Sequence, residues 1–163
     1  MARMPTSPQL PQFVEDFALA LSELGFPRMP ARVLSLAIAA PEESLTAREI
    51  AERLGVSAAA VSGAVRYLGT LNLIRRSRTP GERVDRFGLG DSVWEPVFEA
   101  EIAAYGPLRD LCSRALEGDQ LEGLGRDRVE ETREFLDFMQ AEMAQLVQRW
   151  RAERAARSAA RGA

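Results

Sequence analysis

The chain of 163 residues is long enough for one domain, or for one domain with an appended dimerisation element, and 46% of it is hydrophobic. Histidine is absent and Cys112 is the single cysteine, which excludes His/Cys metal sites, a His-dependent catalytic triad and an internal disulfide. The net charge is −3, and no apolar run resembles a signal peptide or a membrane span. We therefore expect a cytoplasmic protein without membrane contact.

Two helices are predicted near the N-terminus. Residues 1–9 contain proline and serine, and we expect them to be disordered. Apolar residues at helical spacing follow Pro11 and predict a first helix that Gly25 closes. A second helix with the same apolar periodicity ends before Pro41. Residues 42–45 are expected to form a short loop.

The stretch from Thr46 to Phe87 predicts a helix-turn-helix followed by a hairpin. Thr46 and Glu49 have the spacing of a capping box, in which each side chain satisfies a free backbone N–H group. Gly55 ends this helix in the left-handed conformation, and Ser57 caps a second helix at once. Two helices joined so closely must cross steeply, as they do in a helix-turn-helix.

The two faces of the second helix differ in chemistry. Its inward positions carry apolar side chains, namely Val61, Ala64, Val65 and Leu68. Its outward positions are mostly small and uncharged, which would let the helix approach the floor of a DNA major groove. These outward residues and the N-cap form the first part of the expected DNA contact: Ser57, Ala58, Ala59, Ser62, Gly63 and Arg66.

A hairpin is predicted after Asn72, which closes the second helix. Its strands are expected at Leu73–Arg78 and Val84–Leu89, around a turn-rich tip of Thr79-Pro80-Gly81-Glu82. A hairpin in this place is a wing, and its arginines form the second part of the expected DNA contact: Arg75, Arg76, Arg78, Arg83 and Arg86. We expect Arg83 to reach the minor groove and Asp85 to brace an arginine.

The charge distribution supports this assignment. Residues 57–90 carry six arginines against two acids, a balance of +4, whereas residues 1–56 and 91–163 have balances of −2 and −5. The positive charge is therefore concentrated where phosphate contact is expected, although the whole chain is acidic.

Two more helices are predicted after the wing. Asp91 or Ser92 is expected to cap the first, and Gly106-Pro107 to break or kink it. A loop from Gly118 to Gly125 precedes the last helix, Arg126 to about Arg157. That helix carries a wide heptad seam, which requires a partner. With the N-terminal helix, it forms the expected dimer interface: Phe13, Phe17, Leu136, Met139, Met143, Leu146 and Trp150.

Residues 45–87, LTAREIAERLGVSAAAVSGAVRYLGTLNLIRRSRTPGERVDRF, resemble the winged helix-turn-helix of the MarR family of bacterial transcriptional regulators. The segments GFPRMPARVL and DSVWEPVF resemble its GbsR-like branch, and the resemblance covers roughly residues 10 to 155. The resemblance implies a mainly α fold with a small β-hairpin wing and N- and C-terminal dimerisation helices. Gly63 departs from the family pattern, because many relatives carry a long polar or basic side chain there.

The resemblance also implies a function and a domain organisation. We expect a homodimer that binds double-stranded DNA at a pseudo-palindromic operator and represses transcription. The DNA-binding lobe would comprise residues 28–90, and the dimerisation region residues 10–27 and 91–157. Disordered ends are expected at 1–9 and 158–163.

Relatives of this family hold effectors between the DNA-binding lobe and the dimer helices. The resemblance therefore implies a pocket for a small apolar or aromatic effector, with core packing as the alternative for its residues: Phe17, Phe26, Trp94, Phe98 and Tyr105. Cys112 could sense oxidants, but its neighbours are apolar and no His or Lys lies near to activate the thiol, which favours a packing role.

The two alternatives to a DNA-binding regulator are an enzyme and an interaction module. The sequence holds no nucleophile–base pair, metal cluster or phosphate loop, so we expect neither an enzyme nor a cofactor. A winged helix can also serve as a protein–protein interaction module, and the local charge of +4 argues against that function here. The arginines near the C-terminus are expected to complement the helix dipole and to stay solvated.

Overall fold

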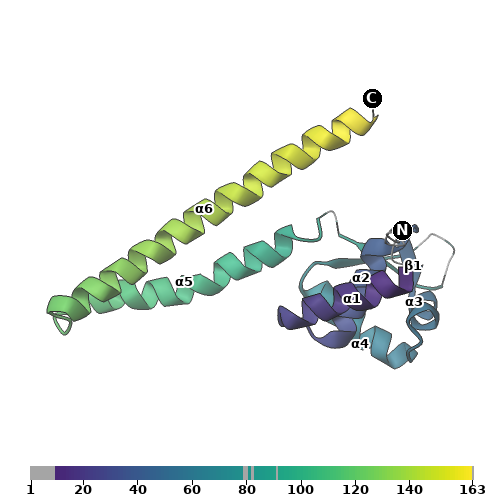
Figure 1. The fold of residues 1–163 in the computed structure, drawn as a ribbon, viewed down its shortest axis with the longest axis horizontal. Helices are drawn as coiled ribbons and strands as arrows, with labels where there is room; N and C mark the ends of the chain where they lie inside the picture. Colours follow the sequence, from purple (N-terminus) through teal and green to yellow (C-terminus); the bar gives the residue numbers. More distant parts are fainter. Residues whose placement is uncertain (1–9, 79–80, 82, 91, 163) are drawn as a thin grey trace, which may run out of the picture. The chain divides into compact units, whose positions relative to one another are not determined.

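The structure is a computed structural model that describes residues 10–78, 81, 83–90 and 92–162. It is mainly helical, with one small antiparallel sheet (Figure 1). The chain divides into two compact units, residues 1–93 and 94–163. Among the helices of the described residues, none is both long and apolar enough to cross a membrane.

The first unit begins with two packed helices, α1 (Leu10–Glu23) and α2 (Arg28–Ala39). Helix α1 buries Val14, Ala18 and Leu21, whose spacing of three to four residues places them on one face. Arg32 of α2 ties the pair to the next helix, because its guanidinium bonds Glu15 at 2.5 Å and the carbonyl oxygen of Leu54 at 3.0 Å.

The helix-turn-helix consists of α3 (Ala47–Leu54) and α4 (Ala58–Thr70), and its predicted caps are confirmed. Thr46 and Glu49 form both bonds of the capping box. Gly55 adopts the left-handed conformation with φ of 64°, and the Ser57 hydroxyl accepts from the backbone N–H of Ala60 at 3.2 Å. These local bonds satisfy free N–H groups at both helix starts and fix the turn between them.

Helix α4 packs by the face that the sequence predicts, with one exception. Val61, Ala64 and Leu68 are buried, as are Ile50 and Leu54 of α3. Val65 was predicted to face inward, but it is only half-buried and lines a surface groove instead. Its position on the helix turns it toward the wing rather than toward α3.

The sheet has three strands in the order β1-β3-β2: β1 (Ser44–Thr46), β2 (Ile74–Ser77) and β3 (Arg86–Leu89). The prediction of a loop at 42–45 was wrong, because Ser44 to Thr46 pair with Gly88 to Arg86. The approach is close at Gly88, where a Cβ atom would lie 2.6 Å from the carbonyl oxygen of Glu43. Only glycine allows β1 to pair here without a shift of the backbone.

The second unit is a pair of long helices, α5 (Glu95–Glu117) and α6 (Gly123–Gly162). Helix α5 starts later than predicted, with Trp94 at its N-cap and no side-chain capping bond. The predicted loop is shorter, and α6 extends beyond Arg157 because alanine and arginine, which favour helix, dominate its end.

The predicted break at Gly106-Pro107 is absent from α5, which continues through Pro107. A proline inside a helix removes one backbone hydrogen bond and crowds the preceding turn. Gln140 of α6 donates to the carbonyl oxygen of Ile102 at 3.3 Å, in that preceding turn. Helix α6 packs along α5 in this region.

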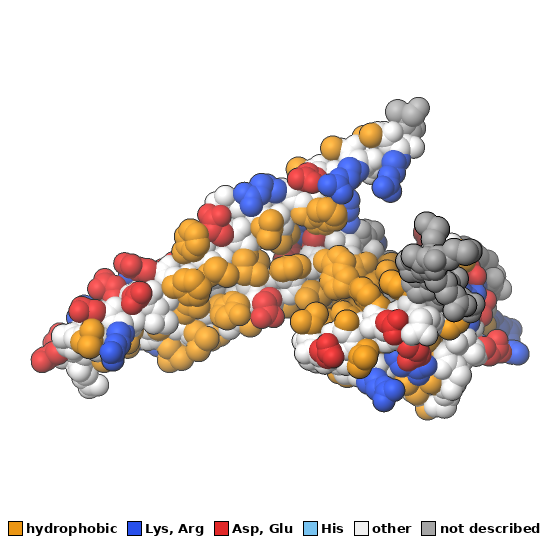
Figure 2. Space-filling view, in the orientation of Figure 1, with side chains coloured by type: hydrophobic (Ala, Val, Ile, Leu, Met, Phe, Trp, Pro, Cys, Tyr) orange, Lys and Arg blue, Asp and Glu red, His pale blue; other side chains and the backbone are white. Residues whose placement is uncertain are grey.

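The apolar seam of α6 does not bury as one stripe. Leu136 and Val147 are buried, whereas Phe135, Phe138, Leu146 and Trp150 are exposed. Figure 2 shows hydrophobic side chains gathered over α5 and α6. The seam is therefore divided between an inner part, which joins the two helices, and an outer part, which this chain leaves uncovered within the unit.

Ion pairs connect the C-terminal half of α6 to the start of α5. Arg151 bonds Glu95 at 2.7 Å and Glu99 at 2.5 Å, and Arg154 lies 3.5 Å from the buried Glu95 carboxylate. These arginines were expected to stay solvated, but two of them have structural partners instead. Arg157 lies over the ring of Trp150.

Candidate nucleic-acid interface

The outward face of α4 is open to solvent. The structure places all six predicted residues of this face, from Ser57 to Arg66, among the exposed ones. A Cβ atom added at Gly63 would meet nothing within 4 Å, so this glycine is not required by packing inside the chain. The residues of this face are mostly small and uncharged, with Arg66 as its long side chain.

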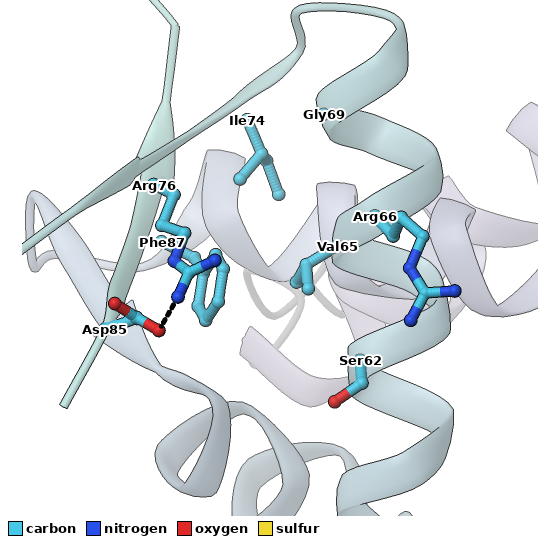
Figure 3. A pocket seen from close by; sticks show the side chains of 8 residues that line it. All are labelled: Ser62, Val65, Arg66, Gly69, Ile74, Arg76, Asp85 and Phe87. Atoms are coloured by element: carbon cyan, nitrogen blue, oxygen red, sulfur yellow. Dashed lines mark hydrogen bonds and ion pairs between the residues drawn. The ribbon is translucent and has the colours of Figure 1, made fainter.

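A groove of about 440 Å³ lies between this helix and the wing (Figure 3). Ser62, Val65 and Arg66 lie on its helix side. Arg76, Asp85 and Phe87 of the wing lie across from them. The groove thus brings the predicted base-reading positions of the helix beside the predicted backbone-binding positions of the wing.

Asp85 joins two wing arginines. Its Oδ2 accepts from Arg76, and its Oδ1 accepts from Nε and Nη2 of Arg78 at 3.1 and 2.8 Å. Hydrogen bonds from Arg76, which has the larger effect, and from Arg78 hold the pKa of the Asp85 carboxyl below its ordinary value. The sequence predicted that Asp85 could brace one arginine, and the structure gives it two.

The other arginines of the wing differ in their surroundings. Arg86 donates to the hydroxyl and the carbonyl oxygen of Ser44 at 3.1 and 2.8 Å, so its side chain holds β1 against β3. The structure therefore gives Arg86 a structural role, where the sequence predicted DNA contact. Arg75 and Arg83 are exposed.

Arg66 and Arg83 are the least constrained cations of the predicted interface. Within the described part of the chain, neither forms a hydrogen bond or an ion pair. Thr79, Pro80 and Glu82 of the predicted wing tip lie outside the described residues.

Contacts outside the groove fix the orientation of α3. Arg53, in its last turn, forms a two-point ion pair with Glu42 at 2.9 and 2.6 Å. This pairing lowers the pKa of Glu42 from 4.5 to about 2. Arg32 donates to the carbonyl oxygen of Leu54, the last residue of α3. Both contacts therefore hold the C-terminal end of the first helix of the helix-turn-helix.

The residues of the predicted effector pocket fall in different units. Phe17 stacks on Phe13 with ring centroids 5.3 Å apart, in the first unit. Trp94 and Phe98 line an apolar groove of about 280 Å³ in the second unit, together with Leu146, Val147 and Trp150. Core packing, the alternative for these aromatics, is wrong for Trp94 and Phe98, because both are exposed.

The remaining predicted residues are Phe26, Tyr105 and Cys112. Phe26 and Tyr105 are half-buried, and the Tyr105 hydroxyl lies 3.4 Å from the Glu101 carboxylate. Cys112 is a free, half-buried thiol. In the described ranges no cluster of three or more His, Cys, Asp or Glu side chains is suited to a metal ion.

Family comparisons agree with the winged helix and its appended helices. Residues 24–83 match the model of the MarR family, and residues 92–153 match that of MmpR5-like MarR family transcriptional regulators. The two segments have 60 and 62 residues, or 122 of 163 in all. The chain belongs to the MarR family. The matches do not single out the GbsR-like branch, which stays a prediction.

Three solved structures align with most of this chain. A crystal structure of a transcriptional regulator aligns with 89% of this chain and 99% of its own, at 24% identity and a TM-score of 0.72. MepR, a transcription regulator of the Staphylococcus aureus multidrug efflux pump MepA, aligns with 82% of this chain and 90% of its own, at 22% identity and a TM-score of 0.42. A MepR mutant bound to an oligodeoxyribonucleotide aligns with 82% of this chain and 89% of its own, at 22% identity and a TM-score of 0.42.

Of these three structures, only the first has a TM-score above 0.5, so the structural likeness in fold rests on it. No curated protein matches the sequence significantly.

Proposed function

We propose that this MarR-family protein is a cytoplasmic, sequence-specific transcriptional repressor that binds a pseudo-palindromic operator as a homodimer. The observation that carries the proposal is the groove between α4 and the wing. It sets Ser62 and Arg66, on an exposed small-residue face, beside Arg76 of the arginine-rich sheet.

The two sides of the groove suit different parts of a DNA duplex. The face of α4 can enter the major groove, where Arg66 can reach a guanine edge and Ser62 either base of a pair. The wing carries Arg76, Arg78 and Arg83, which suit phosphates and a narrow minor groove. Residues 28–90 would form the DNA-binding lobe.

Residues 10–27 and 91–157 would provide the dimer interface. The support for this is the outer seam of α6, where Phe135, Phe138, Leu146 and Trp150 remain exposed. Uncovered apolar patches of this kind are typical of protein interfaces. A twofold axis through such an interface would present two α4 helices to two half-sites.

We further propose that a small apolar or aromatic effector adjusts the affinity for DNA. The apolar groove in the second unit supports such a ligand, because three aromatic rings line it: those of Trp94, Phe98 and Trp150. Displacement of the protein from its operator by a ligand, followed in a metabolite screen, would test this part separately.

Selection of bound fragments from random DNA tests the main proposal. We expect an enriched site with inverted half-sites about 10 base pairs apart, centre to centre. The matched control is Ser62→Glu, which places a carboxylate on the exposed face of α4 and should abolish enrichment. Equal recovery of all sequences by both proteins would contradict sequence-specific binding and favour a protein–protein interaction module.

A further inference from the structure

The position of Asp85 follows from the register of the wing. Strands β2 and β3 pair Ile74 with Leu89 and Ser77 with Arg86. Continuing this register by one residue places Asp85 opposite Arg78, and diagonal to Arg76 on the same face of the ribbon. The three side chains therefore meet because of the backbone pairing and not by chance contact of long side chains.

Both oxygens of the Asp85 carboxylate are engaged. Oδ1 accepts the two-point contact from Arg78, and Oδ2 accepts from Arg76. The Asp85 side chain is 24% exposed, whereas Arg76 and Arg78 are 65% and 57% exposed. The anchor is thus sheltered while the two guanidinium groups remain open to a ligand.

This face of the wing borders the groove. Arg76 and Asp85 line it with Ser62 and Arg66, as Figure 3 shows. A carboxylate beside a DNA-binding groove repels phosphate, so it weakens attraction to any duplex. The cluster of two guanidinium groups and one carboxylate carries a net charge of +1, whereas the two guanidinium groups alone would carry +2.

We propose that Asp85 is a positioning and specificity-determining residue, which holds Arg76 and Arg78 in one orientation and limits binding to DNA of any sequence. This proposal rests on the proposed function. The planar guanidinium loses less conformational freedom on binding when it is already held in place. The Asp85 carboxylate also lowers the sequence-independent attraction of the wing to phosphate. The difference in affinity between the operator and other DNA therefore grows.

The test compares Asp85→Asn with wild type on the selected operator and on a scrambled duplex of equal length. Fluorescence anisotropy over a series of salt concentrations gives both affinities and their salt dependence. The matched control is Asp16→Asn, which removes the same charge from α1, where Asp16 accepts a hydrogen bond from Gln12 at 2.9 Å. Circular dichroism establishes that each variant is folded.

We expect Asp85→Asn to bind the scrambled duplex more tightly, with a salt slope steeper by about 0.9 for each additional phosphate neutralised, or roughly 2 per dimer. The ratio of operator to scrambled affinity should fall by at least about fivefold, as when one oriented hydrogen-bond pair to a base is removed. Asp16→Asn should leave the ratio and the slope near those of wild type.

Other outcomes would overturn the proposal in distinguishable ways. If wild type binds no duplex, the proposed function fails and this inference fails with it. If wild type binds and Asp85→Asn behaves as Asp16→Asn does, the role of Asp85 alone is refuted. Weaker binding of both duplexes with an unchanged slope would show a merely structural residue.

A second variant serves if Asp85→Asn does not fold. Asp85→Glu keeps the charge and moves the carboxylate by one methylene group, so we expect an unchanged salt slope with a reduced affinity ratio. An unchanged ratio for a folded Asp85→Glu would refute the positioning role.

Discussion

The two units of the chain differ in how completely they bury their apolar side chains. In the first, helices and a sheet close around fully buried side chains such as Leu34, Leu68 and Leu73. In the second, two helices bury Leu136 and Val147, while Phe98, Phe138 and Leu146 are exposed. The first unit has a closed hydrophobic core, whereas the second buries only part of its apolar side chains. The groove therefore lies on a unit with a closed core, whereas the long helices leave apolar side chains exposed, as the proposed dimer requires.

The largest expected effect is on assembly. Phe138→Glu combined with Leu146→Glu should give a monomer in analytical ultracentrifugation, because charges buried against an apolar partner cost several kcal/mol. Operator affinity should fall with it, because each half-site would be bound independently. Leu124→Glu, also exposed on α6 but near its start, is the control. A wild type that is monomeric at micromolar concentration would count against the interface.

The next effect concerns the closed core of the first unit. Leu68→Ala should lower the free energy of unfolding by about 2–5 kcal/mol, since Leu68 is fully buried and its truncation leaves a cavity. Leu19→Ala, on the exposed side of α1, should change it by less than about 0.5 kcal/mol. Urea unfolding followed by circular dichroism measures both, and equal losses would refute the assignment of the core.

Two arginines separate recognition from attraction within the first unit. Arg66→Ala should change which bases are preferred, at about 1–3 kcal/mol for each bidentate hydrogen-bond pair removed. Arg83→Ala should weaken binding to every sequence and make the salt slope shallower by about 0.9 for each phosphate no longer neutralised, or roughly 2 per dimer. An unchanged affinity and slope for Arg83→Ala would leave Arg83 as a solvated side chain.

The smallest effect is a pH dependence at the edge of the helix-turn-helix. Pairing with Arg53 lowers the pKa of Glu42 from 4.5 to about 2, so the folded state favours the charged carboxylate. The stabilisation is present above pH 4.5 and is lost as the pH falls toward about 2. Glu42→Gln should remove this part of the acid sensitivity in thermal melts at several pH values. An identical pH profile for Glu42→Gln would contradict the pairing.

Local signals made the helix-turn-helix predictable from sequence. The capping box of Thr46 and Glu49, the left-handed Gly55 and the N-cap Ser57 each involve residues at most four positions apart. Such signals depend on backbone geometry that neighbours alone determine. The same holds for Asn72, whose positive φ of 56° ends the region of α4 as predicted.

Long-range contacts account for the errors. Strand β1 has three residues, too few for a periodic pattern, and it forms through pairing with a strand some forty residues later in the chain. Helix α5 continues through Pro107 and packs along α6, a contact between segments far apart in the sequence. The bonds of Arg86 depend on β1, which the sequence does not display. Asp85 was predicted to brace one arginine, and the register of β2 and β3 brings a second one to it.

The contact at Gly88 has a consequence for how this protein can change over evolutionary time. An alanine there differs from glycine by one methyl group, yet that group would lie 2.6 Å from a backbone oxygen that has no rotamer to adopt. Either β1 or β3 would have to move, and the bonds from Arg86 to Ser44 span those two strands. A position that a substitution matrix scores as permissive is thus costly to replace in this fold.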